Sequence, residues 1–301
     1  KMAFTDKNAN PTEILTQWFE VDRIFGISNI GSSSSTNNSN DPNSKSSNED
    51  MKNKIEYLVK WKELDYDSFS VESLENFEDS SAIIEYKKRL LRMNPKKTPI
   101  RWVHPNISQL VKITRLPVSK NGEIFRDFQL EGLNWLIECW YQRRFSIFGD
   151  MTREGKIPQL INMLNFLSTQ FQINGPFLVL ASENQVSSWK DHFDNWSNLN
   201  VVVLSGNSSS RQITIDNELE VRDDHGRLIQ DYIRCDVLLT SYKTFLSNSQ
   251  TLMEIDWRYV IADDGSKMRN SRSRIRNSLK QLKYEHITLT MEWEMLKPKN
   301  D

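Results

Sequence analysis

The sequence predicts an α/β protein in two parts: a small α+β module, followed by a parallel sheet with helices on both faces. Three observations support this prediction. From about residue 126 onward, short apolar runs alternate with amphipathic segments, the pattern of a parallel sheet buried on both sides. The first part carries two strand-like runs and one helix-like run. A chain of 301 residues with 38% hydrophobic content is long enough for two cores.

The first module is expected over residues 15–93, after an N-terminal extension of residues 1–14. Apolar and aromatic side chains approach strand alternation over 15–28, and Tyr57, Val59 and Trp61 alternate with polar residues in the next run. Helical spacing of apolar residues predicts a helix over 81–93. The Ser, Asn and Asp tract between the two strands cannot bury enough apolar area to offset its ordering entropy. We therefore expect a disordered insert over 31–54.

Residues 94–124 contain four prolines and several basic side chains, a composition that predicts an irregular basic linker.

The second part, 125–301, holds the predicted sheet. Its helix faces carry Trp135, Leu164 and Leu167, which we expect in the core. Six apolar runs predict its strands, at residues 145–148, 177–181, 201–204, 236–240, 258–262 and 286–290.

Composition excludes several classes of function. The 39 Lys and Arg residues against 40 Asp and Glu give a net charge of -1, so a nucleic-acid site must come from a local basic patch. Cys139 and Cys235 lack C-x-x-C spacing and clustered histidines, which argues against a disulfide framework or a zinc site. No apolar run reaches the ~18 residues of a membrane span and no signal-peptide pattern begins the chain. We expect a soluble intracellular protein with no membrane partner.

Residues 145–162, FSIFGDMTREGKIPQLIN, give an apolar run, a polar turn with Gly155 and Lys156, and an amphipathic segment. This is the strand, loop and helix order of a phosphate-binding loop. The full pattern G-x-x-x-x-G-K-[ST] is incomplete, because Asp150 occupies the first glycine position and Ile157 replaces the hydroxyl residue that holds Mg²⁺. The alternative is an ordinary turn from strand to helix.

Three further segments appear in a fixed order around this loop: FRDFQLEGLNWL at 125–136, VIADDGSKMRNSRS at 260–273 and ITLTMEW at 287–293. With them, the chain from residue 125 resembles the first, RecA-like lobe of the chromodomain helicase DNA-binding (CHD) family of chromatin remodellers in helicase superfamily two. The resemblance implies ATP and Mg²⁺ as cofactors, nucleosomes and DNA as partners, and a nuclear location. The family's second lobe is expected to be absent from this sequence.

The resemblance assigns roles to five residues. Gln129 matches the glutamine that reads the adenine edge, and Gly155 and Lys156 match the phosphate-loop pair, with the lysine facing the β- and γ-phosphates. Asp263 matches the carboxylate that organises Mg²⁺. Asp264 stands in the catalytic position, where the family has a glutamate that reaches the attacking water.

Several departures from the family pattern weaken the predicted nucleotide site. Arg153 replaces the tight-turn glycine, Glu154 adds a carboxylate among the phosphates, and Asp264 is one methylene shorter than glutamate. Of the family's Thr-Gly-Thr-Pro segment only Thr290 is kept. Two functions stay open: an ATP-dependent remodeller with weakened motifs, or an inactive pseudo-ATPase that acts as a chromatin reader or scaffold. ATP turnover with and without nucleosomes would separate them.

In the first module, FEVDRI and YLVKWKELDYDSFSVE resemble the second chromodomain of the same family. The resemblance places Phe19 (or Trp18) and Trp61 at positions of a methyl-lysine cage, which binds histone tails through cation–π contacts. Leu64 stands where a third aromatic residue often lies. The alternative is that Phe19 and Trp61 only pack the small core.

A basic cluster follows Asp263 and Asp264, with five cationic residues among ten positions. We expect it to contact DNA phosphates, because such contacts need only Lys and Arg within reach; the alternative is a solvated helix face. Its members are Lys267, Arg269, Arg272, Arg274 and Arg276. Lys96, Lys97 and Arg101 in the linker are further candidates.

Overall fold

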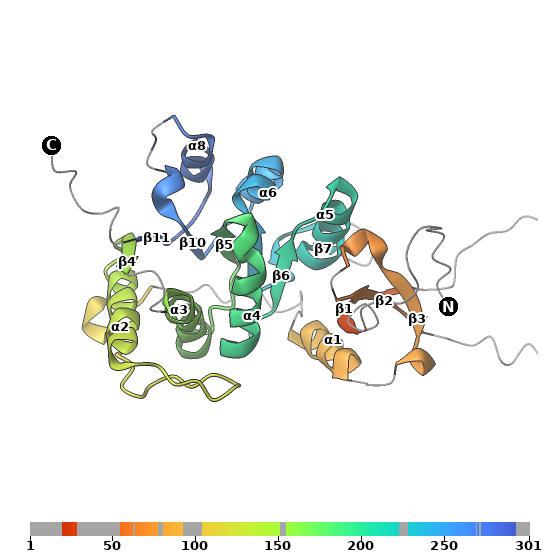
Figure 1. The fold of residues 1–301 in the computed structure, drawn as a ribbon, viewed down its shortest axis with the longest axis horizontal. Coiled ribbons are helices and arrows are strands. Elements are labelled where there is room, and N and C mark those ends of the chain that lie inside the picture. Colours follow the sequence, from red (N-terminus) through yellow and green to blue (C-terminus); the bar gives the residue numbers. More distant parts are fainter. Residues whose placement is uncertain are drawn as a thin grey trace, which may run out of the picture. The chain divides into compact units, whose positions relative to one another are not determined.

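A computed structural model describes residues 20–28, 55–62, 64–77, 81–92, 104–150, 155–222, 228–268, 270 and 272–292 of the chain (Figure 1). They form two compact units: residues up to Asn94 together with Gly206–Asn217, and Pro95–Ser205 together with the chain from Glu218 onward. Several sequence predictions lie outside the described residues: the extension 1–14, the insert 31–54, and the side chains of Phe19, Lys96, Lys97, Arg101, Arg153, Glu154 and Arg269.

The first unit is built on an antiparallel sheet of three strands in the order β1-β2-β3, with helix α1 packed against β1. Tyr57 and Val59 of β2 are buried beside Ile24 of β1 and Ile83 of α1. The alternation seen in the sequence therefore points these residues inward. The elements are β1 (Val21–Ser28), β2 (Glu56–Trp61), η2 (Tyr66–Ser68), β3 (Ser70–Ser73), η3 (Leu74–Asn76) and α1 (Ser81–Arg92).

The first unit also contains α5 (Ser208–Thr214), a helix from far along the chain. The backbone N–H of Tyr66 donates to Ser210 Oγ at 3.1 Å, and Asn207 Nδ2 donates to Asp67 Oδ2 at 2.6 Å. Asn207 also caps α5 by accepting a hydrogen bond from the Ser210 N–H. The sequence did not predict this helix or its contact with η2.

The second unit holds a fully parallel sheet of six strands in the order β4-β11-β10-β5-β9-β6. It confirms the predicted α/β architecture with a parallel sheet, and the six predicted runs are its six strands. Their bounds are β4 (Ser146–Asp150), β5 (Phe177–Ala181), β6 (Val201–Leu204), β9 (Val237–Ser241), β10 (Tyr259–Ala262) and β11 (Ile287–Glu292).

Helices α2, α3 and α4 form the main core with one face of this sheet, which presents Phe177, Val179 and Ile261. Helix α6 packs against strands β5 and β9 and against helix α8 (Figure 1). The helices of the unit are α2 (Asp127–Tyr141), α3 (Lys156–Phe171), α4 (Val186–Trp196), α6 (Tyr242–Ser247), α7 (Ser249–Met253) and α8 (Arg274–Gln281). Shorter turns are η4 (Ile107–Gln109), η5 (Glu183–Gln185), η6 (Ile215–Leu219) and η7 (Gly265–Met268).

Two features of the second unit differ from the sequence prediction. Leu164 and Leu167 are buried as expected, but Trp135 is 39% exposed. Trp135 stacks on Phe148 of β4, which is an edge strand, so the core ends beside it. An antiparallel pair, β7 (Glu220–Arg222) with β8 (Leu228–Ile233), was not predicted at all. None of the helices in the described part of the chain is both long and apolar enough to cross a membrane.

Candidate nucleotide and nucleic-acid site

The carboxyl ends of the parallel strands bring the predicted nucleotide residues to one edge of the sheet. Asp263 and Asp264 follow β10, Thr290 lies in the neighbouring β11, and Lys156 begins α3 after β4. Ligands of open α/β sheets bind at this edge. The structure therefore places these motif residues at one end of the fold.

Asp263 is held by three donors. Its Oδ1 accepts hydrogen bonds from Thr290 Oγ1 and from the Asp264 N–H, the latter at 3.1 Å. Its Oδ2 accepts a hydrogen bond from Trp189 Nε1 at 2.9 Å, and Trp189 is a fully buried residue of α4. The Asp263 carbonyl oxygen accepts a further hydrogen bond from the Tyr242 hydroxyl. Asp263 therefore ties β10 to β11, α4 and α6.

Gly155 and Gln129 meet at the start of α3. Gly155 is the N-cap of α3 with φ 74°, in the left-handed region that favours glycine. A Cβ there would lie 2.3 Å from Gln129 Nε2, so a larger residue would displace the end of the Gln129 side chain. Gln129 Oε1 accepts a hydrogen bond from the Arg126 N–H at 2.9 Å. Lys156 Nζ donates to the Met291 carbonyl oxygen at 3.2 Å.

The described residues at this edge do not supply the donor set of a Mg²⁺ site of the kind that the resemblance implies. Mg²⁺ requires oxygen ligands in near-octahedral geometry. Ile157, in the position of the metal-binding hydroxyl, is an apolar side chain packed against the core. The Asp263 carboxylate oxygens already accept three hydrogen bonds. The described residues contain no group of three or more His, Cys, Asp or Glu side chains that could hold a metal.

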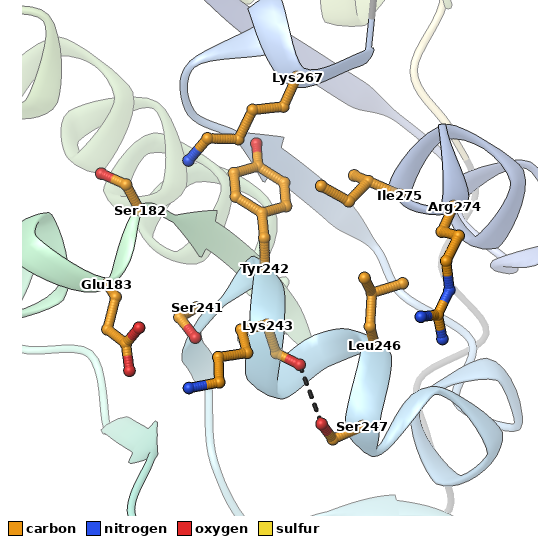
Figure 2. A pocket seen from close by; sticks show the side chains of 10 residues that line it. All are labelled: Ser182, Glu183, Ser241, Tyr242, Lys243, Leu246, Ser247, Lys267, Arg274 and Ile275. Atoms are coloured by element: carbon orange, nitrogen blue, oxygen red, sulfur yellow. Dashed lines mark hydrogen bonds between the residues drawn. The ribbon is translucent and has the colours of Figure 1, made fainter. Parts of the chain in front are cut away.

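A pocket of about 520 Å³ opens near this edge (Figure 2). Its walls come from the segment after β5, the end of β9 with α6, η7 and the start of α8. In Figure 2 the Tyr242 ring stands in the middle of the pocket, with Lys267 above it and Arg274 to one side. The lining residues are Ser182, Glu183, Ser241, Tyr242, Lys243, Leu246, Ser247, Lys267, Arg274 and Ile275.

The pocket lining carries three cations, Lys243, Lys267 and Arg274, against one carboxylate, Glu183. Lys267 Nζ lies 4.9 Å from the centre of the Tyr242 ring, within cation–π range, and 3.6 Å from Asp264 Oδ2. Burial, reinforced by the nearby Asp263 and Asp264 carboxylates, raises the pKa of Tyr242 well above its usual value. The Tyr242 hydroxyl therefore keeps its proton for the hydrogen bond to Asp263.

The structure brings together only part of the predicted basic cluster. Lys267 and Arg274 line the pocket, whereas Arg272 and Arg276 are not among its lining residues. Arg276 lies two positions after Arg274 on α8, which is about 200° around a helix. Sequence reasoning missed Lys243, although it comes just after a predicted strand, where ligand-binding side chains of parallel sheets gather.

One of the two methyl-lysine cage candidates lies in the described part of the first unit. Trp61 packs against the small core, and its Nε1 donates to Ser70 Oγ at 2.9 Å. Phe19 lies outside the described residues. The cage stays a prediction, as does the alternative that Trp61 only packs the core.

Comparison with known proteins places the second unit, described above, in a family. Residues 128–290 match the SNF2-related domain. The chain is 34% identical over 236 residues to chromodomain-helicase-DNA-binding protein 8 of Danio rerio, covering 78% of this chain and 9% of that protein. It is 35% identical over 236 residues to chromodomain-helicase-DNA-binding protein 9 of Mus musculus, covering 78% and 8%.

The chain thus spans less than a tenth of the length of these curated relatives. Among solved structures, a Sulfolobus solfataricus SWI2/SNF2 ATPase core in complex with dsDNA aligns with a TM-score of 0.46 and 17% identity, over 61% of this chain and 34% of that one. The family match covers more than half of the sequence, so the chain belongs to the SNF2-related domain family.

Proposed function

We propose that this chain binds the phosphate backbone of nuclear DNA, in nucleosomes, as the first lobe of a CHD-type chromatin remodeller. The observation that carries the proposal is the pocket that Lys243, Lys267 and Arg274 line together with the Ser182 and Ser241 hydroxyls. Cations and hydroxyl groups are the side chains that contact phosphate oxygens, and such contacts need no particular base sequence. The relatives' names, which include helicase and DNA-binding, agree with this partner.

A second candidate function is that of an inactive pseudo-ATPase, a chromatin reader or scaffold. The observation that favours it is the nucleotide edge, where Ile157 supplies no metal ligand and Asp263 is held by three protein donors. Phosphoryl transfer depends on positioning and electrostatic stabilisation, which both suffer when the metal is held poorly. On this proposal Mg²⁺-ATP binds weakly. A reader role would use Trp61 and Phe19 for a methylated histone tail.

The DNA proposal is tested by fluorescence anisotropy of a labelled duplex of about 20 base pairs, at two salt concentrations. The variant is Lys243→Ala with Arg274→Ala, and the matched control is Lys280→Ala with Lys283→Ala, which removes the same charge from residues that do not line the pocket. We expect the pocket variant to lose roughly tenfold or more in affinity and to reduce the slope of log K against log salt by about 2. A pocket variant that matched the parent would overturn the proposal.

A further inference from the structure

We propose that Lys267 is a positioning residue shared between the pocket and Asp264, so that a phosphate entering the pocket draws the Lys267 ammonium away from the Asp264 carboxylate. The inference rests on the proposed function, because it takes the entering anion to be a nucleic-acid phosphate. It links two places in the lobe that the proposed function treats separately: the basic pocket and the turn after β10.

Lys267 already contacts both places. Its Nζ lies 3.6 Å from Asp264 Oδ2 and 4.9 Å from the centre of the Tyr242 ring in the pocket. Figure 2 shows the Lys267 side chain extended across the Tyr242 ring, with the ammonium end on the side of the pocket where Ser182 lies. A small movement of the lysine stem therefore carries its charge from Asp264 to a ligand in the pocket.

The pair between Lys267 and Asp264 is suited to exchange. Its separation of 3.6 Å is longer than a hydrogen bond, and the two side chains are 34% and 40% exposed. An exposed ion pair of this kind stabilises little and is screened by salt. A phosphate in the pocket, which carries a full negative charge beside two other cations, competes well for the same ammonium.

The surroundings of the pair stay fixed while Lys267 changes partner. Tyr242 is anchored through its hydroxyl to the Asp263 carbonyl, so its ring offers a cation–π contact in both positions. Asp264 sits at φ 58°, in the left-handed region, and its N–H is held by Asp263 Oδ1 and Thr290 Oγ1. Ser266 Oγ donates to Asp264 Oδ1. Release of Lys267 therefore changes the charge balance at Asp264 without moving the turn.

Linkage makes the effect reciprocal: if phosphate loosens the ion pair between Lys267 and Asp264, then removal of the Asp264 charge strengthens phosphate binding through Lys267.

The test compares duplex affinity, by anisotropy, for the parent, Asp264→Asn, Lys267→Met and the double variant. Asparagine tolerates the left-handed region, so Asp264→Asn keeps the turn. Methionine keeps the apolar stem over Tyr242. Asp256→Asn is the control, because Asp256 pairs with Lys283 at a distance of 3.7 Å between charged atoms and does not line the pocket.

We expect Asp264→Asn to tighten duplex binding about threefold to tenfold in the parent and by less than about twofold in the Lys267→Met background. Asp256→Asn should change affinity by less than about twofold in both backgrounds, which measures the general effect of a lost negative charge. In a Lys267→Arg background, which keeps a cation over the ring, Asp264→Asn should again tighten duplex binding by most of the factor expected in the parent.

Two outcomes would overturn the inference and are distinguishable. If Asp264→Asn tightens binding equally in both backgrounds, the effect is general electrostatics and Lys267 is not shared, while DNA binding stands. If the parent itself does not bind the duplex, the proposed function fails and the inference fails with it. Thermal unfolding of each variant establishes that the comparison is made between folded proteins.

Discussion

At the scale of single residues, the Asp263 carboxylate organises the carboxyl edge of the sheet through donors from β11, α4 and the adjacent Asp264 N–H. The Trp189 indole is a donor that could not be predicted from the sequence, because Trp189 and Asp263 meet only in the folded protein. A hydrogen bond to a carboxylate stabilises a protein by roughly 1.5–3 kcal/mol. Trp189 therefore has a structural role beside its place in the core.

Trp189→Phe keeps the aromatic ring but removes this donor, so we expect it to lower the free energy of unfolding by about 2 kcal/mol. Trp196→Phe is a matched control, because the buried Trp196 Nε1 finds no hydrogen-bond partner among the described residues. Trp196→Phe should change the free energy of unfolding by less than about 1 kcal/mol. Urea unfolding measures both variants, and equal losses would contradict the assigned role of the Asp263 hydrogen bond.

His286 gives the lobe a predictable pH dependence. It is 2% exposed, and its Nε2 finds no hydrogen-bond partner in the described part of the chain. Burial, and secondarily the charge of His104, lower the pKa of His286 from 6.5 to about 4. In the unfolded chain the same imidazole takes up a proton below about pH 6.5, while the folded protein resists this until about pH 4.

Stability should therefore fall as the pH drops from about 7 to about 5, with roughly 2 kcal/mol of the loss due to His286. In His286→Phe this part of the loss should vanish, and His192→Phe, at a half-buried position on α4, should keep it. Urea unfolding at the two pH values measures the difference. An unchanged pH dependence in His286→Phe would show that other groups cause it.

At the scale of elements, we expect the sheet to tolerate a charge at an exposed position of its edge strand but not at a buried position of an inner strand. Leu238 is fully buried on β9, which lies between β5 and β6, so Leu238→Asp buries an unpaired carboxylate and should leave the chain insoluble. Ile147 lies on the edge strand β4 and is 51% exposed. Ile147→Asp should remain soluble. Soluble yields of the two variants test this expectation, and a folded, soluble Leu238→Asp protein would contradict the burial of this position in the core.

The elements also mark where prediction from sequence succeeds. The six strands of the sheet were predictable because strands buried on both faces leave continuous apolar runs. The β7–β8 pair and the contact of α5 with η2 were not, because short segments whose partners lie far along the chain leave no periodic pattern. The exposed position of Trp135 depends on strand order, which periodicity does not encode.

The candidate site, like the fold, contains some residues that could be proposed from the sequence and others that could not. Asp263, Gly155 and Lys156 could be proposed from the sequence because they follow strands in a recognisable motif order, and they stay candidates. Lys243 and Trp189 were not, because their role depends on which side chains the fold brings beside them. Of the predicted cations, spacing along the helix could have separated Arg274 from Arg276, since only one face of α8 can line the pocket.

At the scale of the whole molecule, the second unit combines a parallel sheet and a basic pocket with an apolar Ile157 at the start of α3. We expect Mg²⁺-ATP to bind more weakly than to an intact phosphate loop by several kcal/mol, because Ile157 offers no oxygen and Glu154 adds an anion. Isothermal titration checks this expectation, and an affinity in the micromolar range would contradict it. Ile157→Thr should strengthen binding if the missing hydroxyl is a main cause.

The most direct test of the whole account is the affinity of the 301-residue chain for a labelled duplex, with Mg²⁺ held constant and ATP present or absent. We predict salt-sensitive binding that ATP changes by less than about twofold, because the proposed phosphate contacts come from the basic pocket lining and we expect Mg²⁺-ATP to bind weakly. Absence of binding at low salt, or a shift of about tenfold or more on adding ATP, would contradict the account.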